Sequence, residues 1–428
     1  MARVTKRGVF MRGRVLSILI CLFSGFGAVA ETVENARLTE AEAILVDQPW
    51  ADLAAWQALS SHGLPLIDNH PENETLSRVT FAYRGSPDIV SVRLDSVLNA
   101  PYAAPWVSDY HRDFTLPLSR IAGSDIWSLT LDVHRDVQAS YSFLVETDAG
   151  FIRRGDPANP RRLRGQDAEA VLIGDRVGEA SAWRPIPPRL QRPAQALVMD
   201  SEALNRAVFL NVHPAVTENP DAPILILYDS FLWGVRAPAW EIVQNLVDQG
   251  RIPPVHVVLI DQIDAASAAL NYADQSAFIA DELLPYLSSQ SGLTGPVILG
   301  GASRRGLSAT ITALQNPDDI DAVISLSGSF YWAPEGDAME WLPRQIRQAP
   351  DRAPRFYLAA GSLEYAPTST NRGHVMLDTN QRMAEALISS GYEVELDIFA
   401  GGHDIAAWRA ALAEGLVSLL GEPANAPD

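Results

Sequence analysis

A serine in a tight turn is the residue of this sequence whose surroundings point most clearly to chemistry. Ser303 lies in GlyAlaSerArgArgGly at 301–306, after the apolar run VILG and before the helical pattern LSATITAL. A strand, a sharp turn and a helix form the local structure that exposes a nucleophilic serine. Such a turn needs small neighbours, and Gly301 is one of them. Arg305, however, stands where these turns usually have a second glycine.

A serine hydroxyl is a weak nucleophile unless a base removes its proton. His403, in GlyGlyHisAsp directly after the last predicted strand, is the best candidate base. A carboxylate should orient this histidine and stabilise its protonated form. Glu364 follows the preceding predicted strand, RFYLAAG, and fits that role by position. Asp378 and Asp337 remain alternatives.

Acyl transfer also requires backbone N–H groups that stabilise the oxyanion. The amide of Arg304, at the start of the predicted helix, is one candidate. The other should come from the loop after the run ILILYD, where we expect the amide of Phe231 or its neighbour Ser230. These residues imply acyl chemistry that uses no metal and no organic cofactor.

Several side chains near these positions are candidates for substrate contact. Trp332 and Trp408 offer flat apolar surfaces to an aromatic acyl group, although aromatic residues at such places often only pack the core. The side chains of Arg304 and Arg305 could attract anionic substrates, or could simply be solvated on the helix face. His374 could line the same cleft, and we expect it to be solvated.

The chain after about residue 200 shows nearly continuous apolar runs separated by amphipathic segments. This texture is typical of buried parallel strands covered by helices on both faces. It predicts an α/β doubly wound sheet, in which ligands bind at the carboxyl ends of the strands. The runs are AVFLNVH, ILILYD, VHVVLID, VILGG, AVISLSG, RFYLAAG and EVELDIFAGG.

The first half of the chain differs in texture. Short alternating runs rich in Val, Thr and aromatic residues begin at Val79 and predict a small antiparallel β-sandwich. A proline-rich passage follows and reads as a linker. We therefore expect a sandwich domain at 31–180, a linker at 181–198 and a catalytic α/β domain at 199–421.

The N-terminus has the pattern of a signal peptide at 1–30. A basic region precedes the apolar run VLSILICLFSGFG, which is shorter than the ~20 residues that span a bilayer. Ala28-Val29-Ala30 resembles a cleavage site, and the only cysteine, Cys21, lies upstream of it. We expect a periplasmic or secreted protein without disulfides and without stable membrane insertion after cleavage.

The formal net charge of the chain is −19. A chain this acidic is a poor partner for nucleic acid, because phosphate binding needs patches of Lys and Arg. It is equally unsuited to anionic lipid surfaces. The expected partner is a small-molecule ester.

The sequence resembles the enterochelin (enterobactin) esterases, which open trilactone siderophores. The resemblance rests on LeuTyrAspSer at 227–230 with Trp233, on the serine turn, on SerLeuSerGlySerPheTyrTrp at 325–332 and on GlyGlyHisAsp through Trp408-Arg409. ValThrPheAlaTyrArgGly at 79–85 is similar to that family's N-terminal sandwich.

The resemblance implies an esterase D-like α/β-hydrolase domain behind the sandwich. It also implies a serine carboxylic ester hydrolase that acts on a siderophore, such as a ferric catecholate, or on a related aromatic ester, and it adds Trp233 to the substrate site. Two departures stand out. Arg305 replaces the family's usual glycine, and Ala268 and Asn271 replace an Arg and a Glu that shape the family's site.

Two other functions remain open. The chain could be a binding protein on a hydrolase fold that has lost turnover, with Arg305 marking a broken turn. It could also be an esterase or acyltransferase that acts on an ester unrelated to siderophores. Intact Ser303 and His403 favour an enzyme.

Overall fold

The structure is a computed structural model of the 428-residue chain. The predicted signal peptide, the stretch 262–271 with Ala268 and Asn271, and the segment 366–372 lie outside the part that it describes. No helix within that part is both long and apolar enough to span a membrane. The described residues are 41, 43–44, 52–61, 63–102, 115–165, 169–177, 183–186, 193–217, 219–261, 272–365 and 373–421.

In the N-terminal half, the elements that the structure bounds are short strands, the helix α2 and the 3-10 turn η1. Their bounds are α2 (Asp52–Ser60), β1 (Leu66–Asn69), β2 (Leu76–Arg84), β3 (Ile89–Ser96), η1 (Val97–Tyr102), β4 (Thr115–Pro117), β5 (Ser119–Arg120), β6 (Ile126–His134), β7 (Gln138–Thr147), β8 (Gly150–Arg154) and β9 (Ala170–Ile173).

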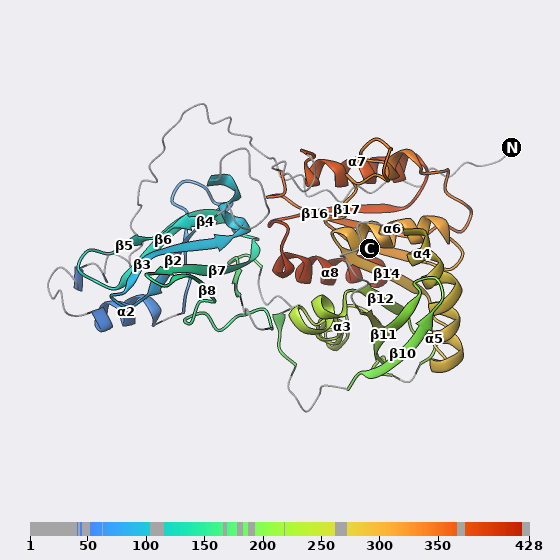
Figure 1. The fold of residues 1–428 in the computed structure, drawn as a ribbon, viewed down its shortest axis with the longest axis horizontal. Helices are drawn as coiled ribbons and strands as arrows, with labels where there is room; N and C mark the ends of the chain where they lie inside the picture. The colour runs from blue at the N-terminus through green and yellow to red at the C-terminus, as the bar shows by residue number, and fades with distance from the viewer. Residues whose placement is uncertain are drawn as a thin grey trace, which may run out of the picture.

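These strands form two antiparallel sheets with a shared apolar core, and we call them together the sandwich (Figure 1). One sheet has the order β1-β2-β6-β5, and the other has the order β4-β3-β7-β8 with β9 paired to β7. Phe81 on β2 and Tyr141 on β7 meet edge to face across the core, with ring centroids 4.9 Å apart. Face-to-face packing of two sheets explains the alternating runs seen in the sequence.

The described residues of the C-terminal half form eight strands and the helices between them. Its elements are β10 (Gln195–Ser201), β11 (Arg206–His213), β12 (Ile224–Tyr228), η4 (Leu232–Arg236), α3 (Ala239–Asp248), β13 (His256–Ile260), α4 (Tyr272–Ala277), η5 (Phe278–Leu283), α5 (Leu284–Ser291), β14 (Val297–Ala302), α6 (Arg304–Gln315), β15 (Ala322–Leu326), η6 (Leu342–Arg344), β16 (Arg355–Gly361), α7 (Met376–Ser389), β17 (Val394–Phe399) and α8 (Ile405–Leu420).

The eight strands make one sheet of order β10-β11-β13-β12-β14-β15-β16-β17, parallel from β13 to β17. Helices cover both of its faces, so alternate strand residues enter different cores. On β12, Ile226 belongs to the core under α6 and α7, whereas Leu227 belongs to the core under α3 and α8. This arrangement confirms the predicted α/β class.

Two expectations about the start of this sheet are wrong. The run AVFLNVH, read as a parallel strand, is β11, and it pairs antiparallel with both β10 and β13. The expected linker at 181–198 does not extend to residue 198, because β10 already begins at Gln195. Trp183, also in that stretch, packs against the core of the eight-stranded sheet.

The carboxyl edge of the parallel strands carries unusual backbone. Asp229, Ser303 and Ser327 follow β12, β14 and β15 directly, and all three have positive φ angles of 73°, 56° and 49°. Residues other than glycine rarely adopt such angles, and those that do cluster at functional sites. The edge where these three strands end is therefore the place to look for a site.

Candidate active site

Ser303 occupies a strained turn between β14 and α6. Its φ and ψ are 56° and −123°, its N–H donates to the carbonyl of Leu326 at 2.8 Å, and its own carbonyl accepts from Gly306 at 3.0 Å. These bonds hold the turn to the end of β15 and to the first turn of the helix. The geometry is that of a nucleophile elbow, with a half-buried hydroxyl above the sheet.

The small residues that this turn needs are Gly301 and Gly306. A Cβ on Gly301 would lie 2.6 Å from the Cβ of Arg305, and a Cβ on Gly306 would lie 2.5 Å from the hydroxyl oxygen of Ser325. Arg305 thus occupies the space that Gly301 leaves, while Gly306 permits the close approach of α6 to β15. The arginine that departs from the family pattern fits the turn.

The side chain of Arg305 is half-buried. Its guanidinium donates to the side-chain carbonyl of Gln275 at 3.4 Å. Burial lowers the pKa of Arg305, and the nearby Tyr228 and Asp229 oppose that shift. Arg304, by contrast, is exposed beside the serine.

We predict that Arg305→Gly keeps kcat/KM within about threefold of wild type, because Gly301 and Gly306 already supply the room that the turn needs and the guanidinium binds Gln275. Glycine near the start of a helix costs about 1 kcal/mol of stability, a fall in Tm of roughly 2–4 °C. Kinetics of ester hydrolysis test the expected kcat/KM, and thermal unfolding tests the expected change in Tm. A fall in Tm of more than about 10 °C would show that Arg305 holds the turn together.

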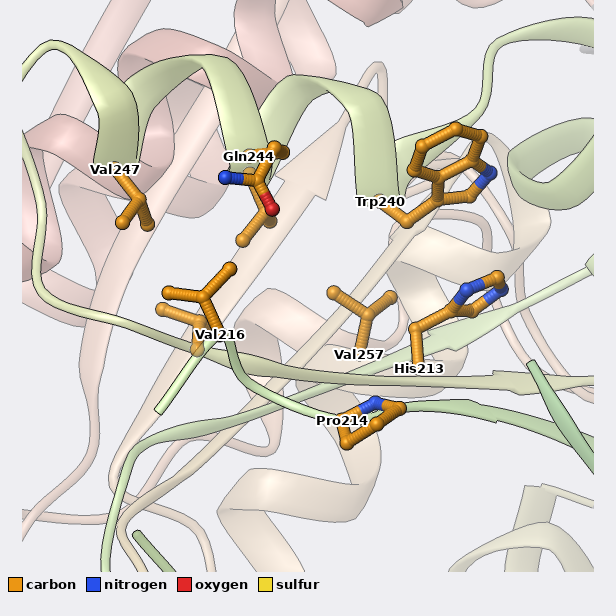
Figure 2. A pocket seen from close by; sticks show the side chains of 9 residues that line it. His213, Pro214, Val216, Trp240, Gln244, Val247 and Val257 are labelled. Atoms are coloured by element: carbon orange, nitrogen blue, oxygen red, sulfur yellow. The ribbon is translucent and has the colours of Figure 1, made fainter. Parts of the chain in front are cut away.

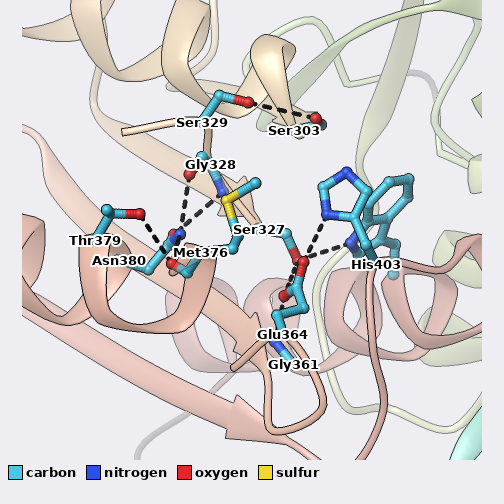
Figure 3. Close-up of polar contacts among 11 residues, drawn as sticks. Ser303, Ser327, Gly328, Ser329, Gly361, Glu364, Met376, Thr379, Asn380 and His403 are labelled. Carbon is cyan, nitrogen blue, oxygen red and sulfur yellow. Dashed lines mark hydrogen bonds and ion pairs between the residues drawn. The ribbon is translucent and has the colours of Figure 1, made fainter. Parts of the chain in front are cut away.

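His403 and Glu364 are joined directly. Nδ1 of His403 lies 2.5 Å from Oε1 of Glu364, and the carboxylate is buried (Figure 3). Its second oxygen accepts from the N–H of Gly361 at 2.6 Å and from the hydroxyl of Ser327 at 2.8 Å. A buried carboxylate with this many donors is held firmly, so it fixes the orientation of the imidazole.

An aromatic ring supports the same imidazole from the side. The ring of Trp408 meets that of His403 edge to face, with centroids 4.7 Å apart. The indole N–H of Trp408 donates to Ser327 at 3.0 Å, which links it to Glu364. In Figure 3 the ring nitrogen of His403 that faces away from Glu364 is directed toward the side on which Ser303 lies.

The other candidate acids are placed differently. The side chains of Asp378, in the first turn of α7, and Asp337, in the loop after β15, are both exposed. We expected His374 to be solvated, but its Nδ1 lies 3.0 Å from a carboxylate oxygen of Glu340. Glu340 also accepts a hydrogen bond from Arg382. Only Glu364, among the three proposed acids, has a described contact with His403.

The two expected oxyanion donors both lie at helix starts. Arg304 is the first residue of α6, and Phe231 is the N-cap of η4. The first N–H groups of a helix have no partner within it and are directed at whatever sits before the helix. Asp229 stabilises the turn between β12 and η4, because its carboxylate accepts a hydrogen bond from the N–H of Leu232 at 3.0 Å.

Two serines of the site escaped the sequence analysis as separate candidates. Ser327 binds Glu364, and the hydroxyl of Ser329 lies 3.4 Å from that of Ser303. The N–H of Ser329 also donates to the carbonyl of Ser303 at 3.1 Å. Both follow β15, the strand next to β14, so the rule that ligands bind at strand ends could have singled them out.

The three aromatic residues predicted to contact substrate differ in how far they are buried. Trp233 is fully buried in the core under α3 and α8, so its assignment to substrate binding is wrong. Trp408 is almost fully buried and contacts His403. Trp332 is half-buried beside Tyr272, with ring centroids 4.6 Å apart, and retains an open surface.

A separate shallow groove lies beside α3 and carries no comparable chemistry (Figure 2). Its walls are mainly valines, and the ring of His213 stacks on that of Trp240 with centroids 5.9 Å apart. Burial lowers the pKa of His213 to about 4, so this imidazole is neutral at neutral pH. The strand ends at Ser303 therefore remain the candidate active site.

Comparison with known proteins agrees with this geometry. The family described as "Putative esterase" matches residues 201–419, which is just over half of the chain and includes Ser303, Glu364 and His403. The chain belongs to this esterase family. It is accordingly a carboxylic ester hydrolase, and the α/β-hydrolase expectation for its catalytic half is confirmed.

Individual esterases resemble this one along nearly their whole length. The iron(III) enterobactin esterase of Dickeya dadantii (strain 3937) is 26% identical over 88% of this chain and 95% of its own. The iron(III) salmochelin esterase of Escherichia coli O6:H1 is 25% identical over 86% and 93%. The crystal structure of ferric enterobactin esterase from Salmonella typhimurium is 25% identical, with a TM-score of 0.69 over 86% of this chain and 98% of that one.

Proposed function

We propose that this esterase cleaves its substrate through an acyl-enzyme on Ser303, with His403 as base and Glu364 as the orienting acid. The 2.5 Å contact between His403 and Glu364, at the strand edge that carries the strained serine, is the observation that carries the proposal. The chain order serine, acid, histidine is that of α/β-hydrolases.

In this mechanism Nε2 of His403 removes the proton from the Ser303 hydroxyl as its oxygen attacks the ester carbonyl. The N–H groups of Arg304 and Phe231 stabilise the negative oxygen of the tetrahedral intermediate. The intermediate collapses to the acyl-enzyme, and His403 gives its proton to the leaving alcohol. Water then attacks the acyl group with His403 again as base, which releases the acid and restores Ser303.

We further propose a catecholate siderophore ester as the substrate, with its bound iron as part of the cargo. The relatives from Dickeya and Escherichia are named for enterobactin and salmochelin. The half-buried ring of Trp332, packed on the buried ring of Tyr272, and the exposed cation of Arg304 suit an anionic aromatic ligand. Burial raises the pKa of Tyr272, and the positive charges of Arg304 and Arg305 oppose that shift.

The absence of the family's Arg and Glu at Ala268 and Asn271 favours a second candidate. An esterase that lacks this pair could act on a smaller aromatic ester instead of a ferric trilactone. The signal-peptide pattern at 1–30 supports a periplasmic or secreted site of action in either case.

A panel of esters separates these candidates. Hydrolysis of enterobactin, its ferric complex, a feruloyl ester and p-nitrophenyl butyrate should be compared as kcat/KM, with Ser303→Ala as the blank. We expect the trilactones to be the best substrates by at least about tenfold. A preference for the feruloyl ester would favour the second candidate, and absence of any turnover dependent on Ser303 would favour a binding protein.

A further inference from the structure

The sandwich makes direct contact with the loop that carries His403. Ser140, on β7, donates through its N–H at 3.1 Å and through its hydroxyl at 2.5 Å to the carboxylate of Asp404, the residue after the histidine. Asp404 also caps α8 by accepting from the N–H of Ala406 at 2.6 Å. One buried carboxylate thus ties the sandwich, the histidine loop and the last helix together.

Backbone packing reinforces this tie. The N–H of Gln138, at the start of β7, donates to the carbonyl of Ala400 at 3.2 Å. A Cβ on Gly402 would lie 2.9 Å from the Cβ of Val97 in η1. The histidine loop therefore packs against the sandwich too closely to admit a side chain at position 402. On the acid side, Leu363 packs against the core of the sandwich next to Glu364.

Buried polar groups fix the two halves of the chain around this point. Glu241 of α3 is buried; it pairs with the buried Arg409 of α8 in the same half of the chain, and with the exposed Arg164 from the segment after β8. The guanidinium of Arg409 lies 4.6 Å from the ring centre of Trp183, whose indole N–H donates to the side chain of Gln138 at 2.6 Å. Charged groups that are buried and paired resist separation, because each would otherwise lose its partner.

We propose that the sandwich is a working part of the active site, in which Ser140 and Val97 are positioning residues that hold the loop 400–404 and thereby align His403. The two glycines of this loop provide no side chain that could anchor it from within. Its alignment therefore depends on the carboxylate of Asp404 and on contacts with neighbouring residues, and on one side these contacts are with the sandwich. The inference rests on the proposed roles of Ser303 and His403.

Ser140→Ala tests this inference most simply. It removes the hydroxyl donor to Asp404, and we expect kcat to fall about tenfold while KM changes less than about twofold, because misplaced catalytic groups slow chemistry more than binding. Amide hydrogen exchange in residues 399–405 should speed up. Ser140→Thr keeps the hydroxyl and should restore most of kcat.

Ser91→Ala is the matched control. Ser91 is also on a sandwich strand and its hydroxyl also binds a carboxylate, but this carboxylate is that of Glu146 on β7, at 2.5 Å, and not that of Asp404. Kinetics and exchange in 399–405 should match wild type. A general loss of sandwich stability would instead affect both serine variants alike.

A second pair of variants probes the same contact from both sides. Gly402→Ala forces a methyl group against Val97, and we expect kcat to fall about tenfold or more. Val97→Gly in the same chain opens that space and should recover at least about a third of the lost activity, although the substitution lies in the other half of the protein. Additive losses in the double variant would count against the inference.

The outcomes distinguish this inference from the proposed function. If Ser140→Ala leaves kcat unchanged in an enzyme whose turnover still depends on Ser303, the inference is wrong and the proposed mechanism stands. If turnover survives Ser303→Ala, the proposed mechanism is wrong and the inference falls with it.

Discussion

Ser303→Ala is expected to lower kcat for ester hydrolysis by about 10⁵- to 10⁶-fold, since removal of the nucleophile leaves only the oxyanion donors and substrate binding to accelerate the reaction. Ser303 is half-buried, and its side chain has one described contact, the 3.4 Å approach to Ser329. Its loss should therefore change the free energy of unfolding by less than about 1 kcal/mol.

His403→Ala is the companion measurement. In the proposed mechanism the two residues act as a unit, so the double variant Ser303→Ala with His403→Ala should be no slower than either single variant. Losses that multiply in the double variant would mean that the residues act independently. Circular dichroism and thermal unfolding serve as the control that all three proteins are folded.

Glu364→Gln is expected to lower kcat by about 10³- to 10⁴-fold, because a neutral amide neither selects the correct histidine tautomer nor stabilises the imidazolium. The substitution keeps the shape of the side chain. Ser327 and the N–H of Gly361 would still have an acceptor, so the loop should remain in place. KM should change much less than kcat.

Asp378→Asn is the matched control for the acid. Asp378 is exposed and was an alternative acid by sequence, so its variant removes the same charge without changing the contact between Glu364 and His403. We expect kcat within about twofold of wild type. If kcat fell strongly in Asp378→Asn and stayed near the wild-type value in Glu364→Gln, Asp378 and not Glu364 would be the acid.

The α/β sheet was predictable because strands buried on both faces are apolar at every position. β12 and β16 are continuous runs of this kind, and both appeared in the sequence as strands. The first strand, β10, was missed because its residues alternate between exposed and buried. Val198 of β10 and Phe209 of β11 are 54% and 57% exposed, as suits an antiparallel pair at a sheet edge.

The candidate site was predictable only as far as strand ends determine it. Ser303, Glu364 and His403 each follow a strand, and their order along the chain limits their roles. The choice of Glu364 over Asp378 depends on loop conformation, which the sequence does not reveal. Ser140 and Asp404 are 264 residues apart, and no local pattern marks their contact.

The departure at Arg305 shows what a motif leaves out. A sequence motif that requires glycine at this position would classify the turn as disrupted by the arginine. The turn instead needs space at Gly301 and Gly306, and both positions are glycine. What matters physically is the room between β14, α6 and β15, which a neighbouring glycine can also supply.

The site of covalent modification tests the central claim most directly. Wild-type protein and the Ser303→Ala, His403→Ala and Ser140→Ala variants should be treated with a fluorophosphonate and analysed by intact and peptide mass spectrometry. The account predicts a single adduct on Ser303 in the wild type, none in Ser303→Ala, and modification slowed by about 10³-fold or more in His403→Ala. Equal labelling of wild type and Ser303→Ala, or an adduct on another residue, would contradict it.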